Sequence, residues 1–180
     1  MKIKRNPFVP KFGQNRPLGL KRILNLGCGD DTYGTDFVDN EKTRKYVKQV
    51  NIDYQKLPYK DSTFDEVFCY QVMQHLKNPE FALREARRVL KPHGILTVFT
   101  INRDFFGWKI TKQDQSPWPV IHIFAKEELE ELLKKIGFEI TYSEYYSAVR
   151  YMNWKKYIIL MTGLFGKHGN ISIQITARKS

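Results

Sequence analysis

Short apolar runs alternate with amphipathic segments along this chain. The runs are rich in Val, Ile, Phe and Tyr, as is typical of β-strands. A run of this length that ends in glycine, as the first one does, is typical of a buried parallel strand. The predicted strands cover residues 22–26, 36–39, 47–52, 66–72, 95–101, 138–142 and 171–177.

Two segments repeat their apolar residues at helical spacing. The first begins at Asn78 and Pro79, residue types that favour a helix N-cap and first turn, and the Pro-x-Gly of residues 92–94 is predicted to stop it. The second covers residues 126–136, with Gly137 in the position of a C-terminal cap.

The order of these elements predicts the fold class. Strands that alternate with helices indicate an α/β domain with a mostly parallel sheet and helices on both faces. The long segment between the last two strands, residues 143–170, permits an antiparallel strand near the C-terminus. Prolines and glycines break up residues 1–20, so we expect a basic N-terminal arm there and a single domain over residues 21–180.

Composition changes this picture little, but charge adds to it. Hydrophobic residues make up 42% of the 180 residues and charged residues 27%, as in globular domains. The net charge is +11, and 13 of the 30 bases lie in residues 1–22 and 145–180, which contain no acid. The remaining residues, 23–144, contain the other 17 bases and all 19 acids. Basic ends favour an anionic partner such as RNA or a membrane surface, although a solvated surface explains them equally well.

Targeting and metal signals are sparse. The basic N-terminus precedes no apolar segment of a signal peptide, and no apolar run reaches the roughly 20 residues of a membrane span. Cys28 and Cys69 belong to no cluster with zinc spacing. We therefore expect a cytoplasmic protein without a metal site, and its oligomeric state stays open.

A glycine turn follows the first predicted strand. Gly27-Cys28-Gly29 stands where open α/β sheets bind ligands, because backbone without side chains lets a ligand approach. A dinucleotide fingerprint needs a third glycine three positions on, but Thr32 stands there, and the interval before the next strand is too short for a full crossover helix. This disfavours NAD and FAD and favours an adenosine-containing ligand without a pyrophosphate.

Two carboxylates follow the next two strands. Asp39 is placed to accept hydrogen bonds from ribose hydroxyls, or alternatively to cap a helix over residues 41–46. Asp53, before Leu57-Pro58, is placed to accept from an adenine amino group, or alternatively to form a turn.

A series of motifs now carries a resemblance to a known family. In order, the motifs are Ile-Leu-Asn-Leu-Gly-Cys-Gly (23–29), Asp53 with Leu57-Pro58, Ser-Thr-Phe-Asp-Glu-Val (62–67), Gln-His-Leu (74–76), Arg-Arg-Val-Leu-Lys-Pro-His-Gly (87–94) and Phe-Ala-Lys-Glu-Glu-Leu (124–129). With these motifs the chain resembles, over residues 21–140, class I S-adenosylmethionine-dependent methyltransferases, above all the subgroup of the ubiquinone and menaquinone biosynthesis enzymes.

The resemblance implies a Rossmann-like sheet of seven strands in the order 3-2-1-4-5-7-6, with S-adenosyl-L-methionine as the cofactor. It implies glycines beneath the cofactor, Asp39 on its ribose, Asp53 on its adenine, and the tip of the fourth strand at its methionine end. The expected cofactor residues are Asn25, Gly27, Cys28, Gly29, Asp39, Asp53, Tyr54, Tyr70, Gln71 and Gln74. Asn25 stands where the family usually has an acid, and Asp31 replaces the third glycine.

Methyl transfer from a sulfonium needs alignment more than a base. If the acceptor is a hydroxyl, His75 or His122 is placed to take its proton, whereas a packed histidine is the alternative for each. Phe105, Phe106 and Trp108 after the fifth strand suit a small-molecule or lipid-like acceptor, or else the core.

Aromatic and basic residues mix in residues 145–168, which is typical of RNA binding and equally of peripheral membrane contact. The sequence thus favours a methyltransferase of small or lipid-like molecules. An RNA (tRNA) methyltransferase and a protein that only binds the cofactor are the alternatives.

Overall fold

The computed structural model describes residues 22–27, 34–36, 47–105, 119–146 and 172–180, and the statements below concern these residues. They form one sheet with the strand order β3-β2-β1-β4-β5-β7-β6. The strands are β1 (Ile23–Leu26), β2 (Gly34–Asp36), β3 (Val47–Gln49), β4 (Phe64–Tyr70), β5 (Leu90–Ile101), β6 (Phe138–Tyr146) and β7 (Ser172–Lys179). A 3-10 turn, η1 (Met73–His75), and two helices, α1 (Pro79–Val89) and α2 (Lys126–Ile136), complete the described elements.

The sheet is mixed. β1 pairs in parallel with β2 and β4, and β4 pairs in parallel with β5, whereas β7 runs antiparallel to both β5 and β6. The predicted Rossmann-like α/β fold is confirmed, with a mixed sheet.

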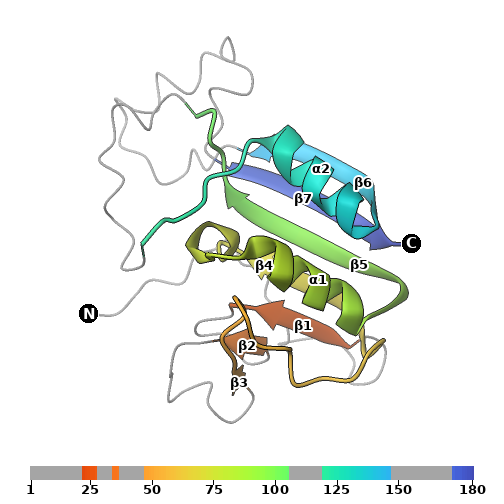
Figure 1. Ribbon diagram of the computed structural model, residues 1–180. Coiled ribbons are helices and arrows are strands. Elements are labelled where there is room, and N and C mark those ends of the chain that lie inside the picture. Colours follow the sequence, from red (N-terminus) through yellow and green to blue (C-terminus); the bar gives the residue numbers. More distant parts are fainter. Residues whose placement is uncertain (1–21, 28–33, 37–46, 106–118, 147–171) are drawn as a thin grey trace, which may run out of the picture.

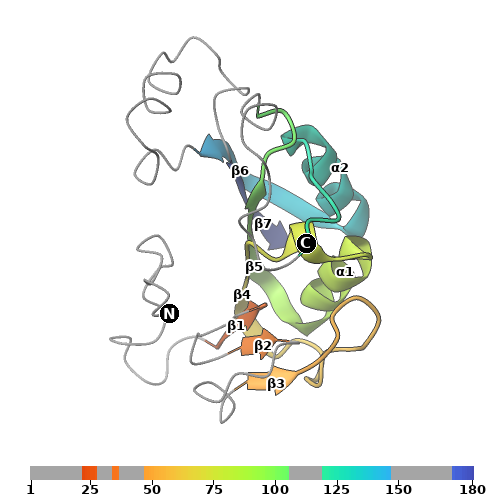
Figure 2. The same ribbon diagram turned by 90° about the vertical axis from the view of Figure 1, so that its left-hand side faces the viewer.

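Both helices lie on the same face of the sheet (Figures 1 and 2). Their apolar stripes meet alternate side chains of the central strands, and the core residues with almost no exposure include Leu24, Val67, Val98, Leu83 and Leu129. The prediction of helices on the other face concerns residues outside those that the structure describes.

The start of α1 and the end of α2 follow from local residues. The Asn78 side chain accepts the Phe81 N–H and caps α1, as predicted. α2 covers the predicted residues 126–136 and ends at Gly137, whose φ of 99° is left-handed.

Several strand predictions were wrong in extent. β3 ends at Gln49 rather than at residue 52, and β4 covers Phe64–Tyr70 rather than residues 66–72. β5 begins at Leu90, directly after α1, and not at residue 95, because Leu90 already pairs with Phe64 and a register shift accommodates residues 91–94. β6 continues beyond residue 142 to Tyr146, since its pairing with β7 extends as far as Ser172. The predicted strand 36–39 overlaps β2 only at Asp36, and residues 37–39 lie outside the described part.

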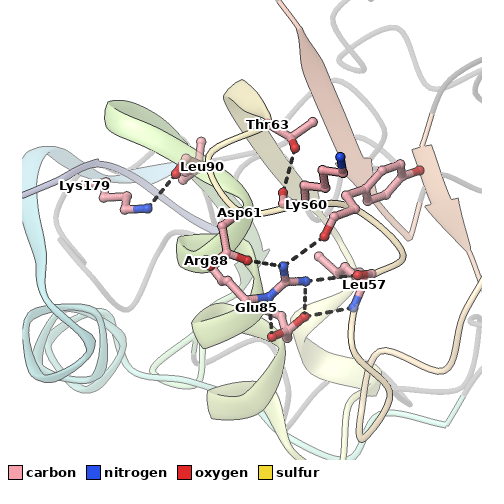
Figure 3. Close-up of polar contacts among 9 residues, drawn as sticks. Leu57, Lys60, Asp61, Thr63, Glu85, Arg88, Leu90 and Lys179 are labelled. Carbon is pink, nitrogen blue, oxygen red and sulfur yellow. Dashed lines mark hydrogen bonds and ion pairs between the residues drawn. The ribbon is translucent and has the colours of Figure 1, made fainter.

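A polar cluster ties α1 to the loop that follows residue 56 (Figure 3). The Arg88 guanidinium donates to Glu85, to Asp61 and to two backbone carbonyls, those of Leu57 and Tyr59, over 2.7–3.0 Å. Glu85 is only 7% exposed and also accepts the Leu57 N–H at 2.8 Å. Burial alone would raise the pKa of Glu85, but the hydrogen bonds from Arg88 and Leu57 hold this pKa below its usual value. The loop is therefore anchored by a nearly buried ion pair.

In the described part of the chain, no helix is long and apolar enough to span a membrane, and no group of three or more His, Cys, Asp or Glu side chains has the arrangement of a metal site.

Candidate functional site

The glycine turn and the end of β4 meet at one edge of the sheet. Leu26 of β1 is in register with Cys69 of β4, so both strands end at the same level. Gly27 has a φ of 67°, in the left-handed region, and a Cβ on it would lie 2.5 Å from Cγ2 of Val72. Any side chain at residue 27 would thus collide with the segment after β4. Gly27, at the end of β1, therefore lies in close contact with the segment that follows β4.

Asn25 lies between two core residues of β1. Leu24 and Leu26 pack into the core shared with the helices, so Asn25 faces the opposite side of the sheet. It is opposite Phe68 of β4 and is 8% exposed. An amide at this position contributes hydrogen-bonding atoms without the negative charge of an acid.

Asp53 joins the turn after β3 to the segment before α1. Its Oδ1 accepts the Asn78 N–H at 2.8 Å, and its own N–H donates to Oδ1 of Asn51 at 3.1 Å. The side chain that closes the turn is thus that of Asn51. Oδ2 of Asp53 makes no hydrogen bond to a described residue. Oδ1 therefore links the turn after β3 to the segment before α1, and Oδ2 is available to a ligand.

Tyr54 follows with its side chain 69% exposed. Its hydroxyl accepts from Nδ2 of Asn51, so the ring is tethered at its polar end. An exposed aromatic ring beside a carboxylate suits a planar ligand that carries an amino group.

Gln74 in η1 is 4% exposed and uses both ends of its amide within the protein. Nε2 donates to Oε1 and to the backbone oxygen of Gln71 at 2.8 and 3.0 Å, and Oε1 accepts from Thr100 Oγ1 at 3.0 Å. Gln71 has a φ of 53° and donates its N–H to the Phe99 carbonyl. The Gln74 amide thus links the residues that follow β4 to the end of β5.

The two histidines lie close to this residue. His75 Nδ1 is 2.9 Å from the carbonyl oxygen of Pro119; since a carbonyl only accepts, Nδ1 carries the hydrogen and Nε2 is the basic nitrogen. His122 is exposed, stacks on Phe124 at 5.8 Å, and donates its backbone N–H to the Gln74 carbonyl. The structure therefore brings the segments of both histidines together.

Aromatic rings occupy the face of the sheet away from the helices. Tyr70 of β4 stacks on Phe99 of β5, with ring centroids 4.9 Å apart. Phe105, which the sequence places either beside the methyl acceptor or in the core, is 4% exposed and therefore buried.

Several predicted site residues lie outside the described residues. They are Cys28, Gly29, Asp39, Phe106, Trp108 and most of residues 145–168. Sequence reasoning missed Thr100 and Asn102, both 0% exposed at the end of β5. Their signal was visible as two polar residues that interrupt the apolar end of a strand.

The comparisons with known proteins agree with this geometry. Residues 21–98 match the methyltransferase domain model. An uncharacterized protein of Methanocaldococcus jannaschii is 30% identical over 132 residues, which cover 66% of this chain and 64% of that protein. The ubiquinone biosynthesis O-methyltransferase of Histophilus somni is 26% identical over 58% of this chain and 56% of its own length. The chain thus spans under two thirds of each of these relatives.

Solved structures extend the likeness over almost the whole fold. An S-adenosylmethionine-dependent methyltransferase from Thermotoga maritima superposes with a TM-score of 0.67 over 91% of this chain and 84% of its own, at 22% identity. At that identity the likeness concerns the fold. The matched domain over residues 21–98 and this shared fold are both those of S-adenosylmethionine-dependent methyltransferases.

Proposed function

We propose that this protein transfers a methyl group from S-adenosyl-L-methionine to a small-molecule or lipid-like acceptor. The observation that carries the proposal is that Gly27, Asp53 and residues 71–75 follow three parallel strands, β1, β3 and β4, which end at the same edge of the sheet. Parallel sheets bind their ligands at this edge. The relatives' names support methyl transfer, and the ubiquinone enzymes among them suggest an apolar acceptor.

The residues present fit this cofactor. Oδ2 of Asp53 is placed to accept from the adenine amino group, beside the exposed ring of Tyr54. Gly27, with Cys28 and Gly29, would lie beneath the cofactor, and Asp39 would bind its ribose. Asn25, Tyr70, Gln71 and Gln74 would surround its methionine end. A second helical layer, on the other face of the sheet, belongs to the same proposal.

The cofactor supplies an activated methyl group, so the chain's own residues mainly align the partners and exclude water. His75, with its hydrogen on Nδ1 toward Pro119, has Nε2 to accept a proton from a hydroxyl acceptor. His122 is the second candidate base because its segment is bound to Gln74.

Cofactor binding is the first test. Calorimetry with S-adenosylhomocysteine is expected to detect binding that Asp39→Ala weakens by about 1 to 3 kcal/mol, because ribose hydrogen bonds are lost. Asp53→Asn keeps an oxygen for the Asn78 N–H, whereas Asp53→Ala loses it. We expect both changes to weaken binding and only Asp53→Ala to lower the melting temperature. Stronger binding of NAD than of S-adenosylhomocysteine would contradict the proposal.

Methyl transfer is the second test. Incubation of the protein and labelled cofactor with a lysate, fractionated afterwards into small molecules, lipids, RNA and protein, is expected to place label in the first or second fraction. The basic chain ends support the RNA alternative. Label in one RNA, together with binding of that RNA at physiological salt, would favour this alternative. Label in no fraction would favour a protein that only binds the cofactor.

A further inference from the structure

We propose that Thr100 and Gln74 form a positioning pair that shapes the methionine end of the cofactor site and docks the segment of His122 beside it. The inference rests on the proposed function and deepens it. Neither residue is assigned a contact with the methyl acceptor.

The first support is the burial of the pair. Thr100 is 0% exposed and Gln74 is 4% exposed, and their side chains are joined by a 3.0 Å hydrogen bond from Oγ1 to Oε1. Buried polar groups cost desolvation energy that apolar residues of the same size avoid. For core packing alone, Val and Met would serve at these positions. The polar pair is therefore better explained by the geometry that it imposes.

The second support is what the Gln74 amide holds. Its Nε2 donates to both oxygens of Gln71, whose left-handed backbone conformation is unfavourable for a residue with a Cβ. Next to Gln71, Val72 packs within 2.5 Å of where a Cβ of Gly27 would lie. The pair thus maintains the loop that borders the glycine turn.

The third support is the backbone oxygen of Gln74. It accepts two N–H groups, those of Ile121 and His122, at 2.7 and 3.1 Å. His75, the next residue, accordingly reaches the carbonyl of Pro119 in the same segment. One residue therefore connects the end of β4, the end of β5 and the segment that leads into α2.

Thr100→Val removes the hydroxyl and keeps the shape of the side chain. The test compares two ligands by calorimetry: S-adenosylhomocysteine, and 5′-methylthioadenosine, which has the same nucleoside but no amino-acid end. We expect Thr100→Val to weaken S-adenosylhomocysteine about tenfold, which equals about 1.4 kcal/mol, and 5′-methylthioadenosine less than about twofold. A general loss of structure would weaken both ligands alike, so the ratio reports the positioning role.

Thr97→Val is the matched control. It makes the same change three residues earlier on β5, on the other face of the sheet, where the Thr97 hydroxyl meets that of Thr176 and no other hydrogen-bond partner among the described residues. We expect it to leave both affinities unchanged, and Thr100→Ser, which retains the hydroxyl, to restore the affinity for S-adenosylhomocysteine. Gln74→Met provides a second disruption of the pair if Thr100→Val folds poorly.

Amide hydrogen exchange without any ligand separates this inference from the proposed function. We expect the amides of Ile121 and His122 to exchange at least several-fold faster in Thr100→Val than in Thr97→Val. Equal exchange in the two variants, or equal weakening of both ligands, would overturn the positioning role. Failure of the wild-type protein to bind either ligand would instead refute the proposed function.

Discussion

Replacement of Gly27 by alanine is expected to abolish measurable binding of S-adenosylhomocysteine and to lower the free energy of unfolding by about 2 to 4 kcal/mol. The left-handed φ of 67° costs about 1 to 2 kcal/mol for a residue with a Cβ. The clash with Val72, at 2.5 Å, adds the cost of overpacking, about 1 to 3 kcal/mol. The backbone must move to relieve both, and it moves at the site. Denaturant unfolding and calorimetry measure the two effects.

Gly137→Ala is the matched control for this substitution. Gly137 has a φ of 99°, and a Cβ there would lie 3.1 Å from Nε of Arg87, so this change also strains the chain. Gly137 precedes β6 at the opposite edge of the sheet, away from the end of β1. We expect Gly137→Ala to lower stability with no change in cofactor affinity. Wild-type affinity in Gly27→Ala would show that the glycine turn does not border the ligand.

Replacement of Arg88 by methionine is expected to lower the free energy of unfolding at pH 7 by about 2 to 4 kcal/mol. The change leaves the Glu85 carboxylate, 7% exposed, with the Leu57 N–H as its remaining partner. Breaking a buried ion pair costs about 3 to 5 kcal/mol, and the 23% exposure of the Arg88 side chain reduces this cost. Urea unfolding provides the measurement.

Arg84→Met is the matched control, one turn earlier on α1. Arg84 pairs with Glu80, but its side chain is 52% exposed, so we expect a loss below about 0.5 kcal/mol. Similar losses in the two variants would contradict the assignment of the Glu85–Arg88 cluster as an anchor.

The pH dependence gives a second readout of the same cluster. The pKa of Glu85 in the folded protein is lowered, so its contribution to stability is present above the unfolded value near 4.5 and is lost as the pH falls through the folded value. Once Glu85 is protonated it no longer needs a cation. The stability difference between wild type and Arg88→Met is therefore expected to shrink below about pH 4.5. A difference that stays constant from pH 7 to pH 3 would contradict this account.

Local sequence determined the elements whose signals are short-range. The apolar stripe of residues 126–136 and Gly137 after it suffice for α2, and Asn78 with Pro79 suffices for the start of α1. The glycine turn and Asp53 were likewise predicted as ligand-binding positions from residue types and spacing, because a close backbone approach requires glycine and a ligand amino group requires an acceptor.

Only the tertiary structure decided features that depend on residues far apart in the chain. Leu90 joins a strand because Phe64, 26 positions earlier, pairs with it, and no local propensity reports such a pairing. Gln74 was expected at the cofactor site, but the sequence does not show that its amide hydrogen-bonds to Thr100 and Gln71. Hydrogen-bond partners are chosen by proximity in the folded sheet, so the sequence alone predicted where a site would lie, and only the fold shows which side chains are held together there.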